Sequence, residues 1–161
     1  MTAFPTFQHK EAFQEGMQQV FGLFQPPNAE IEALLTHILL TKNTSTLIKG
    51  PCGAGKTRLI RAIARTFFNQ ADEDEPDFGQ VTCSQDKTPT DVLYRHDLGE
   101  LMKGVEKVEP RRLVTKRLKW INELGRANHM TFNALLSLLS EYQVRFRDVL
   151  FRSPAYVCLM D

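Results

Sequence analysis

Residues 50 to 57 read GPCGAGKT and combine residue types and spacing that could bind phosphate. Gly50, Gly55, Lys56 and Thr57 occupy every fixed position of the pattern G-x-x-x-x-G-K-[S/T]. Glycines let the backbone turn tightly, so that several N–H groups point at phosphate oxygens, and the dipole of a following helix adds to the attraction. We therefore expect this stretch to be a phosphate-binding loop.

Each side chain of the loop has an expected role. Lys56 would neutralise the β- and γ-phosphates as charge develops on them, and the Thr57 hydroxyl would coordinate Mg²⁺. A chance match in a chain of this length is expected on the order of 1% of the time, so a plain glycine turn with a surface lysine is the weaker alternative. The remaining nucleotide-binding positions are Pro51, Cys52, Gly53, Ala54 and Arg58.

The second half of a phosphoryl-transfer site is predicted at residues 118 to 123, LKWINE. Such sites need a carboxylate that holds the metal ion through water and another that orients the attacking water. Glu123 has the water-activating place, and Asn122 stands where an aspartate is expected. An amide offers an oxygen without negative charge, so metal affinity should fall and turnover should slow. Lys56 and Glu123 are thus the candidate catalytic residues, and Thr57 and Asn122 the candidate Mg²⁺ ligands.

The first half of the chain contains elements that could position the loop. Apolar residues at helical spacing predict a helix from Phe13 to Phe24, ended by Pro26-Pro27, and a second helix over 29–39 capped by Asn28. Residues 45–48 form a β-prone run before the loop, and helical periodicity resumes from 59 to 67. The order strand, loop, helix is the one that a phosphate loop requires.

The second half alternates in the same way. We expect strands over 80–84, 118–121 and 156–160, a short helix beginning at Thr88, a helix over 127–141 and a hairpin in VRFRDVLFRS. The strand at 118–121 requires that Lys119 lie near a sheet edge or snorkel. The acidic run 71–77 reads as a solvated loop, and 99–116 is weakly patterned. Strands alternating with helices predict an α/β sheet covered on both faces.

Bulk properties indicate one ordinary globular domain. The chain has 161 residues, of which 42% are hydrophobic and 24% charged, and its net charge of +1 gives no general attraction to nucleic acid or membranes. The basic cluster between Arg111 and Lys119 reads as a solvated face or subunit contact, so nucleic-acid binding is not expected. No apolar run could span a bilayer and no secretory signal is visible, which predicts a cytoplasmic chain without membrane contact. Cysteines and histidines show no metal-binding spacing.

Several blocks together resemble a known family. TLIKGPCGAGKT, TPTDVL, INELGRANHMTFNALLSLLSEYQV, VRFRDVLFRSP and YVCLM follow the order of the MoxR branch of the AAA+ ATPases over about residues 9–161. The resemblance implies a P-loop NTPase three-layer α/β sandwich with a mainly parallel sheet and a β-hairpin insert in the second helix, facing a ring pore. It also implies ATP and Mg²⁺ as ligands, a homo-oligomeric, commonly hexameric ring, and chaperone-like remodelling or activation of an unknown partner protein.

The sequence departs from this family pattern at two places. Asn122-Glu123 and Gly125-Arg126 stand where Asp-Glu and Asn-Arg are expected. The chain also ends inside the strand that leads to the family's sensor residue, so we expect a truncated AAA+ core over 44–161 behind a helical lead-in over 1–43. Arg126 could act across a subunit interface, although an ordinary salt bridge is favoured.

These departures leave the function open between several readings. ATP hydrolysis is the leading one, and a nucleotide-dependent binding module with negligible hydrolysis is the alternative. A small-molecule kinase would need an acceptor pocket and a lid, which the sequence does not show. No base-reading motif separates ATP from GTP.

Overall fold

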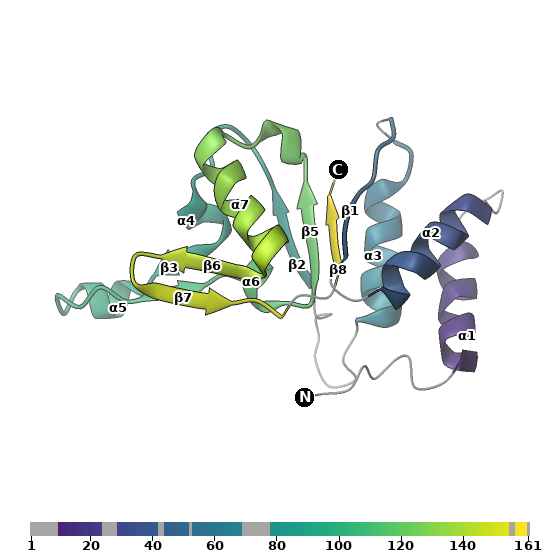
Figure 1. Cartoon of the computed structure of the whole chain (residues 1–161), viewed down its shortest axis with the longest axis horizontal. Coiled ribbons are helices and arrows are strands. Elements are labelled where there is room, and N and C mark those ends of the chain that lie inside the picture. The colour runs from purple at the N-terminus through teal and green to yellow at the C-terminus, as the bar shows by residue number, and fades with distance from the viewer. Residues whose placement is uncertain are drawn as a thin grey trace.

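A four-stranded parallel sheet forms the centre of the molecule, with helices on both sides (Figure 1). The computed structural model describes residues 10–23, 29–41, 44–51, 53–68, 78–154 and 157–160. The sheet order is β1 (Thr44–Leu47), β8 (Val157–Met160), β5 (Leu118–Asn122) and β2 (Phe78–Thr82), and all neighbouring pairs are parallel. The expected α/β class with a parallel sheet is therefore confirmed.

Helices make up the outer layers. Figure 1 shows α1, α2 and α3 on one side of the sheet and α4 and α7 on the other. The helices are α1 (Lys10–Phe21), α2 (Ala29–Leu40), α3 (Lys56–Phe67), α4 (Pro89–Val92), α5 (Leu98–Leu101), α6 (Arg112–Thr115), the short 3₁₀ helix η1 (Leu124–Arg126) and α7 (His129–Glu141). Two small antiparallel hairpins complete the described fold, β3 (Tyr94–His96) with β4 (Val108–Pro110) and β6 (Gln143–Phe146) with β7 (Val149–Arg152).

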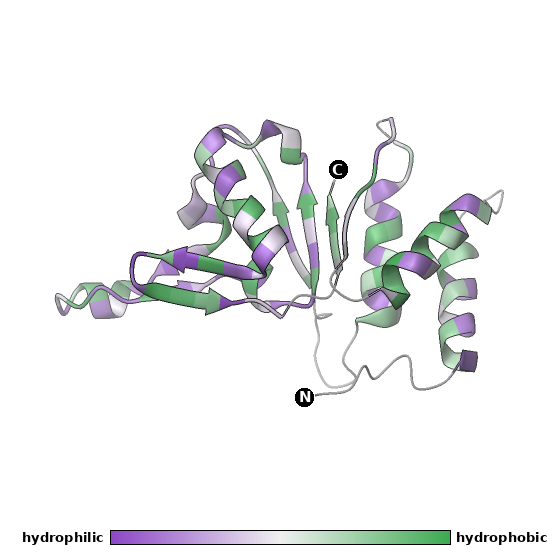
Figure 2. Cartoon of the chain, viewed as in Figure 1, coloured by the Kyte–Doolittle hydropathy of each residue, from purple (hydrophilic) through white to green (hydrophobic). Residues whose placement is uncertain are grey.

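The central strands are buried on both faces because side chains alternate along them. On β5, Leu118 and Trp120 pack with α1, α2 and α3, while Ile121 packs into the opposite core beside α7. On β8, Leu159 joins the first core and Cys158 the second. Figure 2 shows β8 as hydrophobic along its whole length, as a strand buried on both faces requires.

Lys119 corrects one expectation about β5. The sequence required this lysine to lie near a sheet edge or to snorkel, yet β5 lies between β8 and β2, and Lys119 is buried. Its ammonium group donates to the carbonyl oxygens of Lys116 and Pro154. These carbonyl acceptors allow the charge to stay inside the protein, so the strand forms despite the lysine.

Other expectations concern element boundaries. The strand expected at 80–84 is β2, which begins at Phe78 and ends at Thr82. The helix expected at Thr88 is α4, with Thr88 and Asp91 forming a capping box. The weakly patterned stretch contains α5, β4 and α6, and β3 precedes it. The Asn28 cap and the acidic run 71–77 lie outside the described residues.

The two hairpins extend together away from the sheet (Figure 1). Phe146 on β6 contacts the rings of Tyr94 and His96 on β3, and Arg147 forms an ion pair with Glu106. The expected hairpin after Gln143 is thus present, and it packs against a second hairpin that the sequence did not predict.

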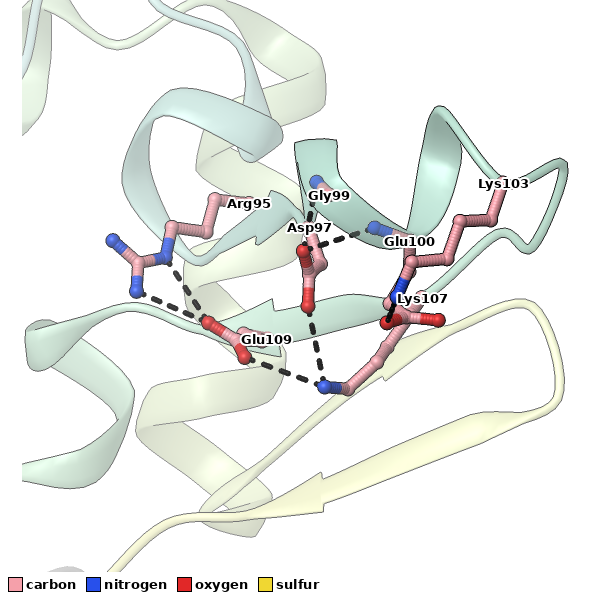
Figure 3. Close-up of polar contacts among 7 residues, drawn as sticks. All are labelled: Arg95, Asp97, Gly99, Glu100, Lys103, Lys107 and Glu109. Carbon is pink, nitrogen blue, oxygen red and sulfur yellow. Dashed lines mark hydrogen bonds and ion pairs between the residues drawn. The ribbon is translucent and has the colours of Figure 1, made fainter.

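Alternating charges hold the β3–β4 hairpin and α5 together (Figure 3). Arg95 pairs with Glu109 across the strands at 3.0 Å, and Lys107 lies 3.2 Å from Asp97 and 3.7 Å from Glu109. Asp97 also accepts hydrogen bonds from the backbone N–H groups of Gly99 and Glu100, capping α5. The backbone N–H of Glu100, and then Lys107, lower the pKa of Asp97.

Within the described ranges, no helix combines the length and the apolar character that crossing a bilayer would require.

Gly79 on β2 is expected to tolerate no side chain. A Cβ atom there would lie 2.6 Å from the carbonyl oxygen of Arg112 and 2.7 Å from the Cα of Leu113, both backbone atoms of α6. Gly79→Ala should therefore lower the free energy of unfolding by about 2 to 3 kcal/mol in chemical denaturation. Gly125→Ala is the control, because nothing lies within 4 Å of its Cβ position, and it should cost under about 0.5 kcal/mol. Equal costs for the two variants would contradict the packing of β2 against α6.

Candidate nucleotide site

The predicted site residues meet at the carboxyl edge of the sheet, where β1 leads into the glycine loop and β5 ends at Asn122. An open cleft of about 1240 Å³ lies there. The residues of the two predicted motifs that line it are Gly50, Gly53, Ala54, Gly55, Lys56, Thr57, Arg58, Asn122 and Glu123. Clefts at this edge of parallel sheets are the usual ligand sites of α/β proteins.

The strands that carry the two motifs are not direct neighbours. β8 lies between β1 and β5, so one strand separates the loop from Glu123. Sequence reasoning did not identify the strand in between. Pro51 is described but does not line the cleft, and Cys52 lies outside the described residues.

The glycine loop has the backbone that its sequence predicts. Gly53 and Gly55 have φ angles of 80° and 84°, a region that residues with a Cβ rarely adopt. Gly55 is the N-cap of α3, and no side chain caps that helix. Gly55, Lys56, Thr57 and Arg58 line the cleft, so α3 begins where the oxygens of a phosphate would bind.

From its position at the start of α3, the side chain of Lys56 extends back over the glycine loop. Its ammonium nitrogen donates to the carbonyl oxygens of Gly50 at 2.9 Å and Pro51 at 3.3 Å. These contacts hold the ammonium group beside the loop that it would serve. A bound phosphate would compete for the same protons, because an ionised oxygen is a stronger acceptor than a carbonyl.

At the end of β5, Asn122 and the next residue, Glu123, line the same cleft as the glycine loop. Asn122 is half-buried, and its amide nitrogen donates to the Thr82 hydroxyl at 3.3 Å on the adjacent strand β2. This contact occupies the nitrogen and leaves the amide oxygen as the atom for a metal-bound water.

Glu123 has an unusual backbone. Its φ of 55° and ψ of 44° lie in the left-handed region, where a side chain costs about 1 kcal/mol or more. Its carboxylate pairs with Arg126 at 3.1 Å, with the two side chains 40% and 71% exposed. The favoured reading of Arg126 as a salt-bridge partner therefore agrees with the structure, although such an exposed pair contributes at most about 1 kcal/mol.

A second layer behind the site was missed by sequence reasoning. Asn128 caps α7 by accepting from the backbone N–H of Thr131, and its amide nitrogen donates to the carbonyls of Gln85 and Lys87. Lys87 in turn donates to the Thr82 carbonyl at 2.6 Å. These contacts hold the segment after β2 against the start of α7, the helix that follows Glu123 in the chain. An asparagine before an apolar helix was the available signal for the cap.

Cys83 lies in the same layer and is not a reactive group. Burial raises the pKa of its thiol, the nearby Lys87 lowers it, and Glu123 raises it. Cys158 on β8 is also buried, and desolvation raises its pKa to about 12. Both cysteines are free and stay protonated near neutral pH.

The donor atoms of the cleft fit a magnesium ion that arrives with phosphate. The Thr57 hydroxyl and the Asn122 amide oxygen are suitable ligands, directly or through water, and Mg²⁺ normally keeps several waters and binds substrate phosphates. Glu123 is the only carboxylate among the described residues that line the cleft. The protein thus offers oxygen atoms for the ion but little negative charge.

Comparisons with known proteins agree with this geometry. The family model for the AAA domain, dynein-related subfamily, matches residues 45–155. Protein MoxR of Methylorubrum extorquens is 31% identical over 112 residues, which cover 67% of this chain and 30% of that protein. Protein MoxR of Paracoccus denitrificans is 30% identical over 99 residues, covering 59% and 26%. The chain therefore spans less than a third of these relatives.

A solved structure supports the fold independently. The crystal structure of a protein from Cytophaga hutchinsonii, described as a candidate ATPase, matches with a TM-score of 0.68 and 20% sequence identity, covering 92% of this chain and 42% of that one. Sheet order, glycine loop and cleft thus define a P-loop nucleoside triphosphatase fold of the AAA+ class. Within that class, the chain belongs to the AAA domain family, dynein-related subfamily, and is of the MoxR type.

The backbone strain at Glu123 can be measured by two substitutions. Glu123→Ala and Glu123→Gly both remove the carboxylate and its pair with Arg126, but only glycine adopts φ near 55° without steric cost. We expect the glycine variant to be the more stable by about 1 kcal/mol in chemical denaturation, since strain relief outweighs its greater chain entropy. An alanine variant as stable as the glycine variant would contradict a strained backbone at this position.

Proposed function

We propose that this chain binds ATP together with Mg²⁺ and hydrolyses the terminal phosphoanhydride bond. The observation that carries the proposal is the shared cleft, which is lined both by the start of α3 with Lys56 and by Glu123 just after β5. A triphosphate held by the first group would place its terminal phosphate toward the second.

In the proposed binding mode, most contacts to the phosphates come from backbone N–H groups. The N–H groups after Gly53 and at the start of α3 would donate hydrogen bonds to the phosphate oxygens, and the helix dipole adds positive potential there. The ammonium group of Lys56 would leave the Gly50 carbonyl for the β- and γ-phosphates, which repays the broken contact with a charge-assisted one.

In hydrolysis, Glu123 would orient a water molecule and accept its proton as the water oxygen attacks the γ-phosphorus. The bond between that phosphorus and the bridging oxygen breaks, and ADP and phosphate leave. Lys56 and the loop amides stabilise the charge that moves onto the leaving oxygen. Mg²⁺, held by Thr57 and Asn122 with the phosphates, would supply further charge neutralisation when bound.

Arg126 competes for Glu123 in the structure described here. While the carboxylate pairs with Arg126, one of its oxygens is directed at the guanidinium group. Because Arg126 is largely exposed and Glu123 is 40% exposed, the pair is weak enough to open when a water molecule binds near a phosphate.

A binding module with negligible hydrolysis is the second candidate, and Asn122 favours it. The amide brings no charge to the metal and donates to Thr82, so the catalytic half of the site is weaker than the phosphate-binding half. Such a module would change its binding to partner molecules according to whether a nucleotide occupies the cleft.

The wider setting of the site is proposed by family analogy. We take 44–161 as the nucleotide-binding core and 1–43 as its helical lead-in, working in a homo-oligomeric ring that remodels or activates a partner protein. The paired hairpins β3–β4 and β6–β7 extend from the core, which suits a part that contacts a partner (Figure 1).

Steady-state phosphate release separates the two candidates. If the chain is an ATPase, Glu123→Gln should lower kcat about 100-fold or more while ATP still binds, because only the water-orienting group changes. Asn122→Asp should raise turnover about tenfold by restoring charge to the metal site. Arg145→Gln, on β6 away from the cleft, serves as the surface control and should change neither value.

Binding without measurable phosphate release in the parent and in Asn122→Asp would establish the binding module instead. Transfer of phosphate to an acceptor other than water would establish a kinase.

A further inference from the structure

The cleft beside the glycine loop is unusually rich in positive charge. Five basic side chains are among the described residues that line it, against one carboxylate, and that carboxylate is paired with Arg126. The basic residues are Lys49, Lys56, Arg58, Arg61 and Arg65. The net charge of the whole chain is only +1, so this concentration is local.

Three of these cations form a row on one face of α3. Arg58, Arg61 and Arg65 follow one another at helical spacing and all border the cleft, and their Cα atoms lie about 3, 8 and 14 Å along the helix axis from Lys56. All three are exposed. Among the described residues, Arg61 and Arg65 have neither a hydrogen-bond nor an ion-pair partner. Arg58 and Arg61 lie within about one Debye length of Lys56 and Arg65 lies within about two, so the first two charges act strongly on a bound triphosphate and the third acts more weakly.

The part of the cleft that would hold the metal ion has little negative charge. A nucleotide usually enters with Mg²⁺, which cancels part of the phosphate charge and is retained by protein carboxylates. Here Asn122 supplies an uncharged amide, and Glu123 is held by Arg126. The side chains of the cleft therefore attract a polyanion more strongly than they attract a divalent cation.

We propose that the cleft captures the metal-free nucleoside triphosphate, with the arginine row of α3 contributing the positive charge that Mg²⁺ contributes in other sites. The free nucleotide carries more negative charge than its magnesium complex and is therefore favoured by a cationic cleft. This inference rests on the proposed nucleotide-binding function and deepens it: Mg²⁺ is needed for turnover, and capture proceeds without it.

The test is the equilibrium affinity for ATP measured by calorimetry, once with saturating Mg²⁺ and once with EDTA, at one ionic strength. The parent chain is expected to show affinities that agree within about threefold. If ATP binds tenfold or more tightly with Mg²⁺, the inference is overturned and nucleotide binding stands. If ATP binds under neither condition, the proposed function falls as well.

Variants identify the source of the charge. Replacing Arg61 and Arg65 together by glutamine should weaken metal-free binding about fivefold or more and weaken binding with Mg²⁺ less, because the complex carries less charge. Arg145→Gln is the matched control and should change neither affinity. Equal losses under both conditions for the double variant would contradict a charge-substituting role.

Asn122→Asp provides the complementary change. A carboxylate there should repel the free triphosphate and retain Mg²⁺, so metal-free affinity should fall about tenfold while affinity with Mg²⁺ is kept. An Asn122→Asp chain whose two affinities match those of the parent would overturn the role assigned to the amide.

Discussion

The pairing of β8 between β1 and β5 is the constraint on which the site depends. Met160 lies level with Leu47 of β1 on one side and with Ile121 of β5 on the other. Because all three strands run in the same direction, the loop after β1 and the pair Asn122-Glu123 lie at the same edge of the sheet, level with each other. The backbone N–H of Ile48 still bonds to Met160, so the loop begins directly at the sheet. A register shift by one residue would also exchange Cys158 and Leu159 between the two cores, so that each core would receive a side chain of a different size.

The site contains several locally unfavourable features, and the stability of the two hydrophobic cores must compensate for them. Positive φ angles at Gly53 and Gly55 need residues without a Cβ, the start of α3 has no side-chain cap, and Glu123 holds a left-handed backbone. Each of these features is unfavourable locally and useful for binding anions or placing a carboxylate. The two buried cores on either face of the sheet supply the compensating stability, and the buried ammonium group of Lys119 donates to the carbonyl oxygens of Lys116 and Pro154.

The sequence predicted the glycine loop, its flanking strand and helix, the short helix beginning at Thr88 and the hairpin after Gln143, because each depends on local residue types. It could not predict that β8 lies between β1 and β5, since strand order is set by long-range pairing. The condition that Lys119 lie near a sheet edge or snorkel was wrong, because the carbonyls of Lys116 and the distant Pro154 accept from its buried ammonium group. The hydrogen bond from the Asn128 amide nitrogen to the Lys87 carbonyl likewise spans 41 positions of the chain, which no local pattern encodes.

The central claim is that backbone amides and one ammonium group at the start of α3 bind a triphosphate. The most direct test is calorimetric titration of ATP into the parent, Lys56→Ala and Lys103→Ala, the last altering an exposed lysine on the distant α5 segment. The account predicts saturable binding by the parent and by Lys103→Ala, and affinity about 100-fold weaker for Lys56→Ala. A parent that binds neither ATP nor GTP, or a Lys56→Ala chain with unchanged affinity, would contradict it.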